Sequence, residues 1–275
     1  MTAAASRFDI GRETAYLRDL GRAFAGALLF NTPLLMTMEM WEQGVAMDRW
    51  RALGFLAAGL PLLYGLSRYA GFSKDRGLRN DLLDTAVALA VGFITAATLL
   101  ALFGVVKGDA PHDAVGIIAL QAIPGGMGAL LARRQLAGDG GGDTDEGQAS
   151  YIGELFLMAA GALFFALNIA PTEEVILIAY KAAPWQDLVM LGLSVLLLHL
   201  IVFTVGFAGQ EEADHPLKAF LHFTLPGYAL TLGVSLFALY LFGRADGHPF
   251  VTWLEMGVVL SVPGAIGAAA ARLLV

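Results

Sequence analysis

Residues 25–30 read Ala-Gly-Ala-Leu-Leu-Phe, and residues 160–165 read Ala-Gly-Ala-Leu-Phe-Phe, an offset of 135. The two stretches stay in step further along, because Thr37-Met38-Glu39 returns as Thr172-Glu173-Glu174. A second match, at an offset of 139, pairs the segment Pro-Gly-x-x-Gly-Ala at 124–129 with the same segment at 263–268. A chain that repeats itself over such a distance is predicted to contain a duplicated structural unit.

The apolar residues fall into runs that are long enough to cross a membrane as helices. Hydrophobic residues make up 57% of the 275 residues and charged residues 15%, against about 45–50% and 25% in a soluble domain. The runs are too long for strands and do not alternate. Eight segments have roughly the 20 residues that a spanning helix needs: 23–43, 52–70, 83–106, 113–133, 153–181, 187–207, 219–242 and 252–274. We therefore predict an all-α polytopic membrane protein with eight transmembrane helices.

The matched stretches divide these helices into two sets of four. Residues 1–22 form a polar N-terminal lead-in, residues 23–137 the first four-helix repeat, residues 138–150 a glycine- and aspartate-rich linker, and residues 151–275 the second repeat. Because each repeat has an even number of helices, both enter the membrane in the same sense, as parallel repeats do. Twelve of the 17 Lys and Arg residues would lie on the side of the termini, so both termini are expected in the cytoplasm.

Composition excludes several classes of protein. The chain has no cysteine, so disulfides and thiolate metal sites are excluded. Its net charge is −7 and its basic residues are scattered, which argues against a nucleic-acid partner. No zinc-protease, serine-hydrolase or phosphate-loop motif is present, and we do not expect an enzyme.

Two acidic positions stand out because they lie inside predicted membrane segments. Glu39 follows Ala23 by 16 residues, so it would lie about 24 Å along its helix, in the outer half of the bilayer. Glu174, with Glu173 beside it, takes the equivalent place in the second repeat. A carboxylate within the membrane is costly and usually functional. The alternative is that both acids lie in the solvated interface.

Prolines and threonines near these acids suggest a cation site. Pro33 and Pro171 would each free a backbone carbonyl four residues earlier, at Leu29 and Leu167. Thr37 and Thr172 would add hydroxyl oxygens, and hard cations prefer oxygen ligands. If Glu39 and Glu174 share a proton, the pKa of one of them should rise. The prolines could also be structural kinks only.

Two further polar residues are expected near the acids as supporting groups. Gln121 lies close in depth to Glu39, and His199 lies in the middle of an apolar helix. A proton-relay role for His199 competes with a neutral, hydrogen-bonded structural histidine. The repeated Pro-Gly-x-x-Gly-Ala segments are interpreted mainly as close helix packing.

Three motifs carry a family resemblance: Thr-Met-Glu-Met-Trp at 37–41, Ala-Pro-Thr-Glu-Glu at 170–174 and Pro-Gly-Tyr-Ala-Leu at 226–230. With them the chain resembles a family of uncharacterised bacterial integral membrane proteins, defined as a domain of unknown function, over nearly all residues after 20. The resemblance implies a location in the bacterial inner membrane and implies no activity or site residues.

The leading hypothesis is a cation transporter or channel, with Glu39 and Glu174 as the ligands of the cation. Glu173, Thr37 and Thr172 would assist, with Gln121 and His199 around them. The cation would be calcium, another divalent ion or a proton, and no other cofactor is expected. The lipid bilayer is the expected surrounding partner, and a homo-oligomer stays open. The alternative is a non-transporting sensor, lipid-binding scaffold or subunit of a complex.

Overall fold

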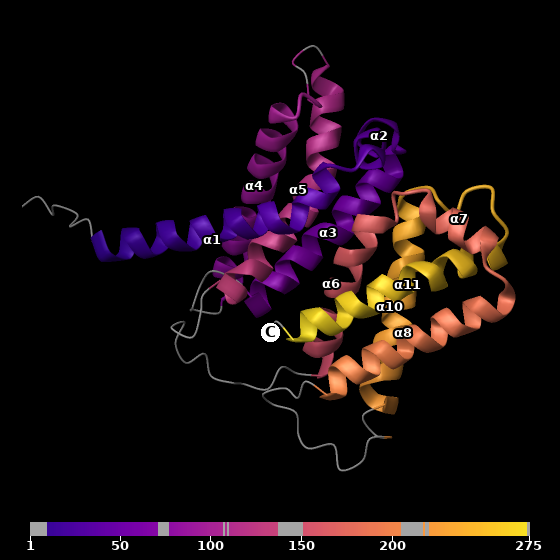
Figure 1. The fold of residues 1–275 in the computed structure, drawn as a ribbon. Helices are drawn as coiled ribbons and strands as arrows, with labels where there is room; N and C mark the ends of the chain where they lie inside the picture. The colour runs from indigo at the N-terminus through magenta and orange to yellow at the C-terminus, as the bar shows by residue number, and fades with distance from the viewer. Residues whose placement is uncertain are drawn as a thin grey trace, which may run out of the picture.

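The computed structural model describes residues 10–70, 77–106, 108, 110–136, 151–204, 217 and 220–273 (Figure 1). Every regular element in these ranges is helical, which confirms the predicted all-α class. Eight helices have 17 or more residues: α1 (Ile10–Leu35), α3 (Arg49–Ala70), α4 (Leu78–Leu102), α5 (Pro111–Leu136), α6 (Tyr151–Ile169), α8 (Pro184–Thr204), α10 (Leu225–Leu241) and α11 (Phe250–Leu273). Three elements are short: α2 (Met38–Ala46), α7 (Glu174–Lys181) and η2 (Phe220–Thr224). The predicted linker 138–150 lies outside the described residues.

Six of these helical segments are long and apolar enough to cross a membrane: Leu78–Leu102, Pro111–Leu131, Tyr151–Ile169, Pro184–Val202, Phe220–Leu241 and Phe250–Ala271. Eight were predicted. In the described ranges, α1 and α3 do not meet these criteria. The reason for α1 is that its apolar part runs only from Ala23 to Leu35, about 20 Å of helix. Its earlier turns are charged and belong to the predicted lead-in, which is helical from Ile10 onward. α3 is bounded by arginines at both ends.

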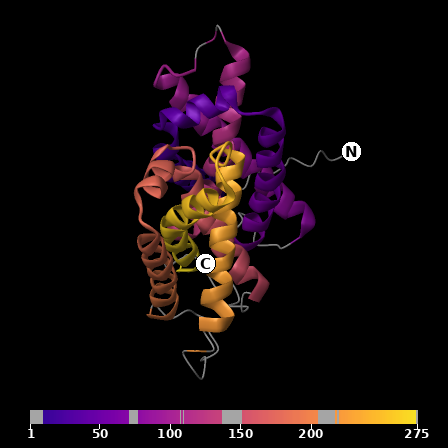
Figure 2. The same cartoon turned by 90° about the vertical axis from the view of Figure 1, so that its right-hand side faces the viewer.

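The helices before and after residue 150 pack in the same order. In the first half α1 and α4 pack on α5, and in the second half α6 and α10 pack on α11. The short helix α2 lies against α5, and α7 lies against α11. The halves meet where α6 contacts α1, α3 and α5 and where α10 contacts α3. In the turned view the molecule is elongated, with the tip of the α4–α5 hairpin at one end (Figure 2).

In both halves a glycine of the repeated Pro-Gly-x-x-Gly-Ala segment lies very close to the backbone of a neighbouring helix. A Cβ atom on Gly128 of α5 would lie 2.7 Å from the carbonyl oxygen of Gly26 in α1. In the second half, a Cβ on Gly161 of α6 would collide with the carbonyl of Gly267 in α11, and the reverse holds for Gly267. Small residues at these points allow the backbones to meet, as is common between membrane helices. The packing interpretation of the Pro-Gly-x-x-Gly-Ala segments fits these contacts.

The helices α4 and α10 end in the same way. Gly104 follows α4 and Gly243 follows α10, and both have φ of 71°. Only glycine takes this left-handed conformation without strain, and it is the usual residue just after a helix. We name the end of the molecule that carries α2, α7 and the α10–α11 loop (residues 242–249) the α2/α7 end; these elements lie together in Figure 1.

Candidate functional site

The two segments that carry the predicted acids are each broken in the middle. α1 ends at Leu35 and α2 begins at Met38, whereas α6 ends at Ile169 and α7 begins at Glu174. The prediction that 23–43 and 153–181 are continuous helices is therefore wrong. Proline explains both breaks, because Pro33 lies in the last turn of α1 and Pro171 lies in the gap before α7, and proline cannot donate a helical hydrogen bond.

The predicted threonines stabilise the ends of the interrupted helices. The Thr37 hydroxyl donates to the carbonyl of Pro33 at 2.6 Å. The Thr172 hydroxyl donates to the carbonyl of Ile169 at 2.8 Å. These acceptors differ from the predicted Leu29 and Leu167 carbonyls, because the chain leaves the helix at the break instead of bending within it. The Thr37 hydroxyl supplies a donor to a carbonyl at a helix end, whereas the Ile169 carbonyl also accepts from the backbone N–H of Thr172 at 3.0 Å.

Both acids lie in the first turn of a short helix. Glu39 is the second residue of α2 and is half-buried, whereas Glu174 is the first residue of α7 and is exposed. A hydrogen bond with Thr172 lowers the pKa of Glu174, and its own backbone N–H and the nearby Arg244 lower it further. The predicted rise in pKa is therefore not seen at Glu174. An ionised carboxylate is favoured here, because the N-terminus of a helix attracts negative charge.

Glu173 has a basic partner that the sequence interpretation missed. Arg244, in the α10–α11 loop, donates to the carbonyl of Pro171 and lies 3.7 Å from the Glu173 carboxylate. The Arg244 side chain is 16% exposed and Glu173 is 82% exposed. The arginine therefore closes the α6–α7 break from one side. The repeat gave no signal for this partner, because the residue of the first half that corresponds to Arg244 is Val105.

The acids are not gathered into one metal centre. Among the described residues there is no group of three or more His, Cys, Asp or Glu side chains arranged to hold a metal ion. Glu39 lies on α2, which packs on α5, and Glu173 and Glu174 lie beside or on α7, which packs on α11. A site built from all three carboxylates is therefore not formed.

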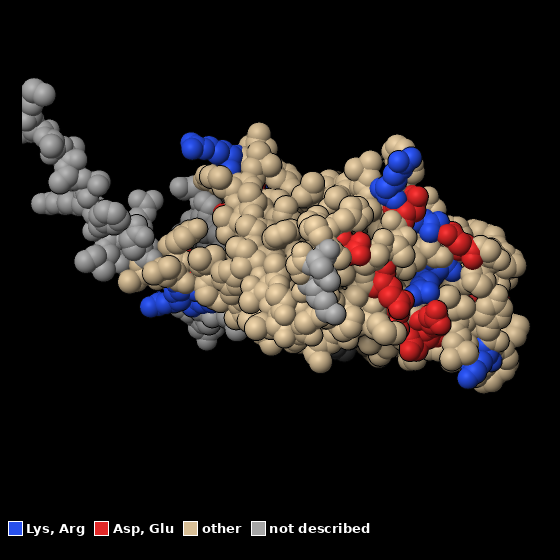
Figure 3. All heavy atoms as spheres, turned by 90° about the horizontal axis from the view of Figure 1, so that it is seen from above, with Lys and Arg blue, Asp and Glu red and all other residues tan. Residues whose placement is uncertain are grey.

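Polar contacts join the two halves at the α2/α7 end. Arg51 donates to the carboxylate of Asp246 at 2.6 Å, and Gln43 donates to the carbonyl of Phe242 at 3.2 Å. A hollow of about 610 Å³ opens beside this ion pair, lined by Asp48, Trp50, Arg51, Gly54, Phe237, Tyr240, Leu241 and Asp246. Figure 3 shows acidic and basic side chains gathered on one side of the face seen from above. Arg51 lowers the pKa of Asp246 by hydrogen bonding to it.

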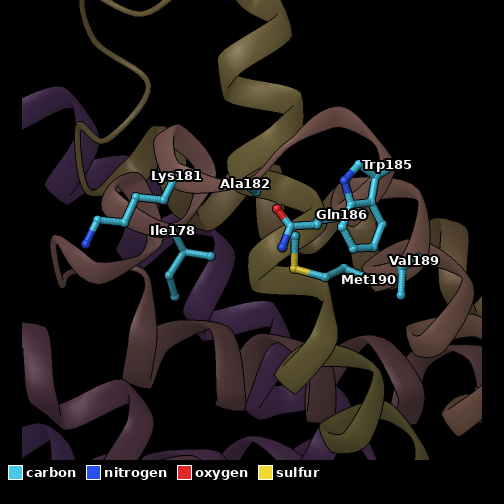
Figure 4. A pocket seen from close by; sticks show the side chains of 7 residues that line it. All are labelled: Ile178, Lys181, Ala182, Trp185, Gln186, Val189 and Met190. Atoms are coloured by element: carbon cyan, nitrogen blue, oxygen red, sulfur yellow. The ribbon is translucent and has the colours of Figure 1, made fainter.

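A mostly apolar groove of about 410 Å³ lies between α7 and the start of α8. Its lining residues are Ile178, Lys181, Ala182, Trp185, Gln186, Val189 and Met190. Lys181 points away from Trp185 (Figure 4), so the amine and the indole do not converge on one point. The Gln186 side chain is held by the backbone N–H of Ala183 at 2.7 Å. The groove therefore offers an apolar surface with polar groups at its edges.

The two supporting residues differ in their surroundings. His199 lies 15 residues after the start of α8, about 22 Å from the α7–α8 corner, and its Nδ1 pairs with the Thr224 hydroxyl at 2.8 Å. It therefore joins α8 to the start of α10 and does not support Glu174. Gln121 is completely buried in α5. It lies next to Asn31 of α1, whose side-chain amide donates to the backbone carbonyl of Gln121 at 3.1 Å.

Residues 19–275 match the family described as "Putative integral membrane protein (DUF2391)". The chain belongs to this family. Neither the curated proteins nor the solved structures contain a match.

Family membership and the apolar helices give the same conclusion about location. The family is one of integral membrane proteins, and six helical segments are long and apolar enough to span a bilayer. This member of the family is therefore a multi-pass integral membrane protein in contact with the lipid bilayer. The all-helical fold and the presence of transmembrane helices agree with the sequence prediction, whereas six candidate spans are found among the described residues and eight were predicted.

Proposed function

We propose that this protein is a transporter or channel for a small cation in the bacterial inner membrane, with both termini in the cytoplasm. The observation that carries the proposal is that two segments predicted to enter the membrane are broken at matching places, each with an acid in the first turn of the helix that resumes. Interrupted helices at membrane depth are tolerated where they are buried in protein or line a water-filled cavity. Transporters use such breaks to bind ions and charged substrates.

We further propose that the molecule is a duplicated four-helix unit, residues 23–137 and 151–275, with the two copies in the same orientation. The supporting observations are the equivalent packing of α1 on α5 and α6 on α11, the paired glycine contacts, and the equal φ of Gly104 and Gly243. Eight long helices give each copy four. Two copies built alike provide two entrances of similar geometry at one end of the molecule.

In this proposal Glu39 and Glu174 bind the cation, each at the break of its own half. Thr37 and Thr172 hold the backbone of the breaks, and Glu173 with Arg244 sets the charge at the second one. Gln121 supports the first break from α5. The cation is calcium, another divalent ion or a proton, and the protein transports it without catalysing a chemical reaction.

The experiment is ion flux in liposomes that contain the purified protein, with dyes for calcium and for protons. We expect the ion flux of the double variant Glu39→Gln and Glu174→Gln to be at least tenfold lower than that of wild type. Glu42→Gln is the matched control, because Glu42 lies one turn further along α2 and is exposed; it should behave as wild type. Full flux in the double variant would reject these acids as cation ligands.

A non-transporting, lipid-binding scaffold is the second candidate. It is favoured by the ion pair of Glu173 with Arg244 and by the apolar groove between α7 and α8, which would suit an acyl chain. If wild-type vesicles carry no cation flux while native mass spectrometry finds retained lipid that Met190→Trp displaces, the scaffold replaces the transporter.

A further inference from the structure

Three polar side chains are buried together in the interior of the first half. Asn31 of α1 and Gln121 of α5 have no exposed surface, and Thr95 of α4 is 3% exposed. Asn31 Oδ1, Thr95 Oγ1 and both polar atoms of the Gln121 side chain lack a hydrogen-bond partner within the described part of the chain. Buried polar atoms in native proteins are nearly always paired, with protein or with ordered water. Such a concentration of unpaired atoms therefore indicates a ligand. We name these three residues the amide cluster.

Backbone contacts place the members of the amide cluster at one level of the bundle. A Cβ on Gly125 would lie 2.9 Å from the Cα of Gly92 in α4 and 3.1 Å from the amide nitrogen of Asn31. Thr95 is one turn beyond Gly92, and Gln121 is one turn before Gly125. Because α4 and α5 form an antiparallel hairpin, these two steps lead in the same direction. Thr95 and Gln121 therefore lie at the same depth, beside Asn31.

The amide cluster also faces the break between α1 and α2. On α5, Gly125 meets Asn31 before the break, and Ile117 meets Gly44 of α2 after it. Gln121 lies midway between these two contacts, about 6 Å along the helix from each. Its side chain is on the same side of α5, because residues four apart share a helix face. Glu39, two residues past the break, is the acid closest to it along the chain.

The second half has apolar residues at the corresponding positions. The residue 135 positions after Asn31 is Ala166, and those 139 positions after Thr95 and Gln121 are Val234 and Leu260. Ala166 and Leu260 are fully buried in the hydrophobic core. The helices therefore do not need amide side chains at this level in order to pack, since the second half packs without them.

We infer that the amide cluster is a mid-membrane binding site for ordered water that carries protons between Glu39 and the interior of the first half. The inference rests on the proposed function, and it names the proton as the transported ion. The cluster offers acceptors at the Asn31 and Gln121 oxygens, a donor at the Gln121 nitrogen, and both at the Thr95 hydroxyl. A bound water typically makes about three hydrogen bonds of both kinds. A metal cation would be opposed by the amide N–H groups, which can only donate.

The proton transfer needs no other reactant. A protonated Glu39 carboxyl breaks its O–H bond, the proton forms a new O–H bond with the first water, and that water releases another of its protons to the next acceptor. Towards the other end of α4 the same buried face carries Thr85, Asp84 and Asp81, with the small Ala88 and Gly92 in between. Asp84 and Asp81 are the buried carboxylates of this face, and Asp81 lies 3.8 Å from the guanidinium of Arg68.

The test uses the full-length protein in liposomes with the pH dye pyranine inside and a potassium diffusion potential. Thr95→Val and Gln121→Leu introduce the residues of the second half. We expect each to lower proton flux at least tenfold, whereas Thr95→Ser, which keeps the hydroxyl, should stay within about twofold of wild type. Ser235→Ala is the matched control, because Ser235 is fully buried and donates within its own helix to the Thr231 carbonyl at 2.8 Å. It should leave proton flux unchanged.

Thermal unfolding of the same variants gives a second readout. If the cluster holds water, Thr95→Val removes water-mediated hydrogen bonds and does not raise the melting temperature. If the cluster is dry, the variant removes an unpaired polar atom and raises it. Unchanged proton flux in Thr95→Val, or a raised melting temperature, overturns the inference. Wild-type vesicles that conduct calcium but not protons also overturn it and leave the proposed cation transport intact. If the Glu39 and Glu174 variants keep normal proton flux and Thr95→Val loses it, the two acids are rejected as ion ligands, and Glu39 is rejected as one end of the proton path.

Discussion

The break between α1 and α2 and the break between α6 and α7 share a backbone plan but differ in what surrounds them. The first break has a polar interior, because the buried amides of Asn31 and Gln121 lie beside it. The second has Ala166 and Leu260 at the corresponding places, both fully buried. At these corresponding positions the first half is therefore polar and the second is apolar.

At the protein surface it is the second break that has a polar covering, whereas the first has an apolar one. Arg244 covers the second break by binding the carbonyl of Pro171 and approaching Glu173. At the corresponding place in the first half the chain has Val105, which packs with apolar residues around Leu100. Similar backbones therefore have different surroundings. The second break has an arginine at its surface, whereas the first has beside it buried amide atoms without a partner among the described residues.

The largest expected effect tests the close glycine contacts between helices that the two halves share. Gly161→Ala puts a methyl group against the Gly267 carbonyl, and we expect a loss of about 3 kcal/mol in stability, since overpacking of a tight contact forces backbone shifts. Gly128→Ala should act similarly in the first half, where the new Cβ lies 2.7 Å from the Gly26 carbonyl. The measurement is the melting temperature in detergent. Gly192→Ala is the control, because nothing lies within 4 Å of its Cβ, and a loss as large there would refute the packing argument.

An intermediate effect tests the difference at the surface. Arg244→Met leaves the Pro171 carbonyl without its donor and Glu173 without its basic partner. We expect a loss of about 1–3 kcal/mol, the usual cost of an unpaired buried polar group, measured by thermal unfolding. Arg49→Met should change little, because Arg49 is exposed and lies over the ring of Trp50. Equal melting temperatures for both variants would show that Arg244 does not close the second break.

The smallest effect tests the contact between the halves. Arg51 lowers the pKa of Asp246 below its ordinary value of 3.8, so the folded protein binds fewer protons there than the unfolded chain. The pair therefore stabilises the fold above about pH 4, and this contribution is lost as the pH falls through the lowered pKa. Because Asp246 is more than half exposed, the effect should be below about 1 kcal/mol. The difference in melting temperature between wild type and Asp246→Asn should shrink as the pH falls from 7 to 3; a constant difference contradicts it.

Much of the fold was predictable from local signals. Long apolar runs gave the helical class and the approximate position of each long helix, because a bilayer permits few other structures. The prolines and threonines near the acids pointed to irregular backbone. The breaks themselves were missed, because apolar residues continue past Glu39 and Glu174 and hydropathy does not register a helix end. α1 does not qualify as a span because the break after Leu35 cuts its apolar part short, whereas α3 has nearly the predicted bounds and carries arginines near both ends.

The candidate site was predictable only in part. Glu39, Gln121 and the threonines were found from their depth and from the repeat, but Asn31 and Thr95 look unremarkable in sequence, and only packing against Gly125 and Gly92 shows them buried together. The pairing of Glu173 with Arg244 joins residues 71 positions apart. Depth along a helix can be counted from a sequence, whereas the direction of a side chain depends on which helices it meets.

The amino-acid composition is sufficient to predict a bundle of membrane helices. Its long apolar runs are most stable in a bilayer, where the backbone N–H and C=O groups must be paired within helices. The sequence also determined where two halves match. Tertiary structure alone decided that the acids begin new helices, that an arginine covers one break, and that amides face the other. These outcomes depend on contacts between distant segments, and the free energy of such contacts has no signature in local sequence.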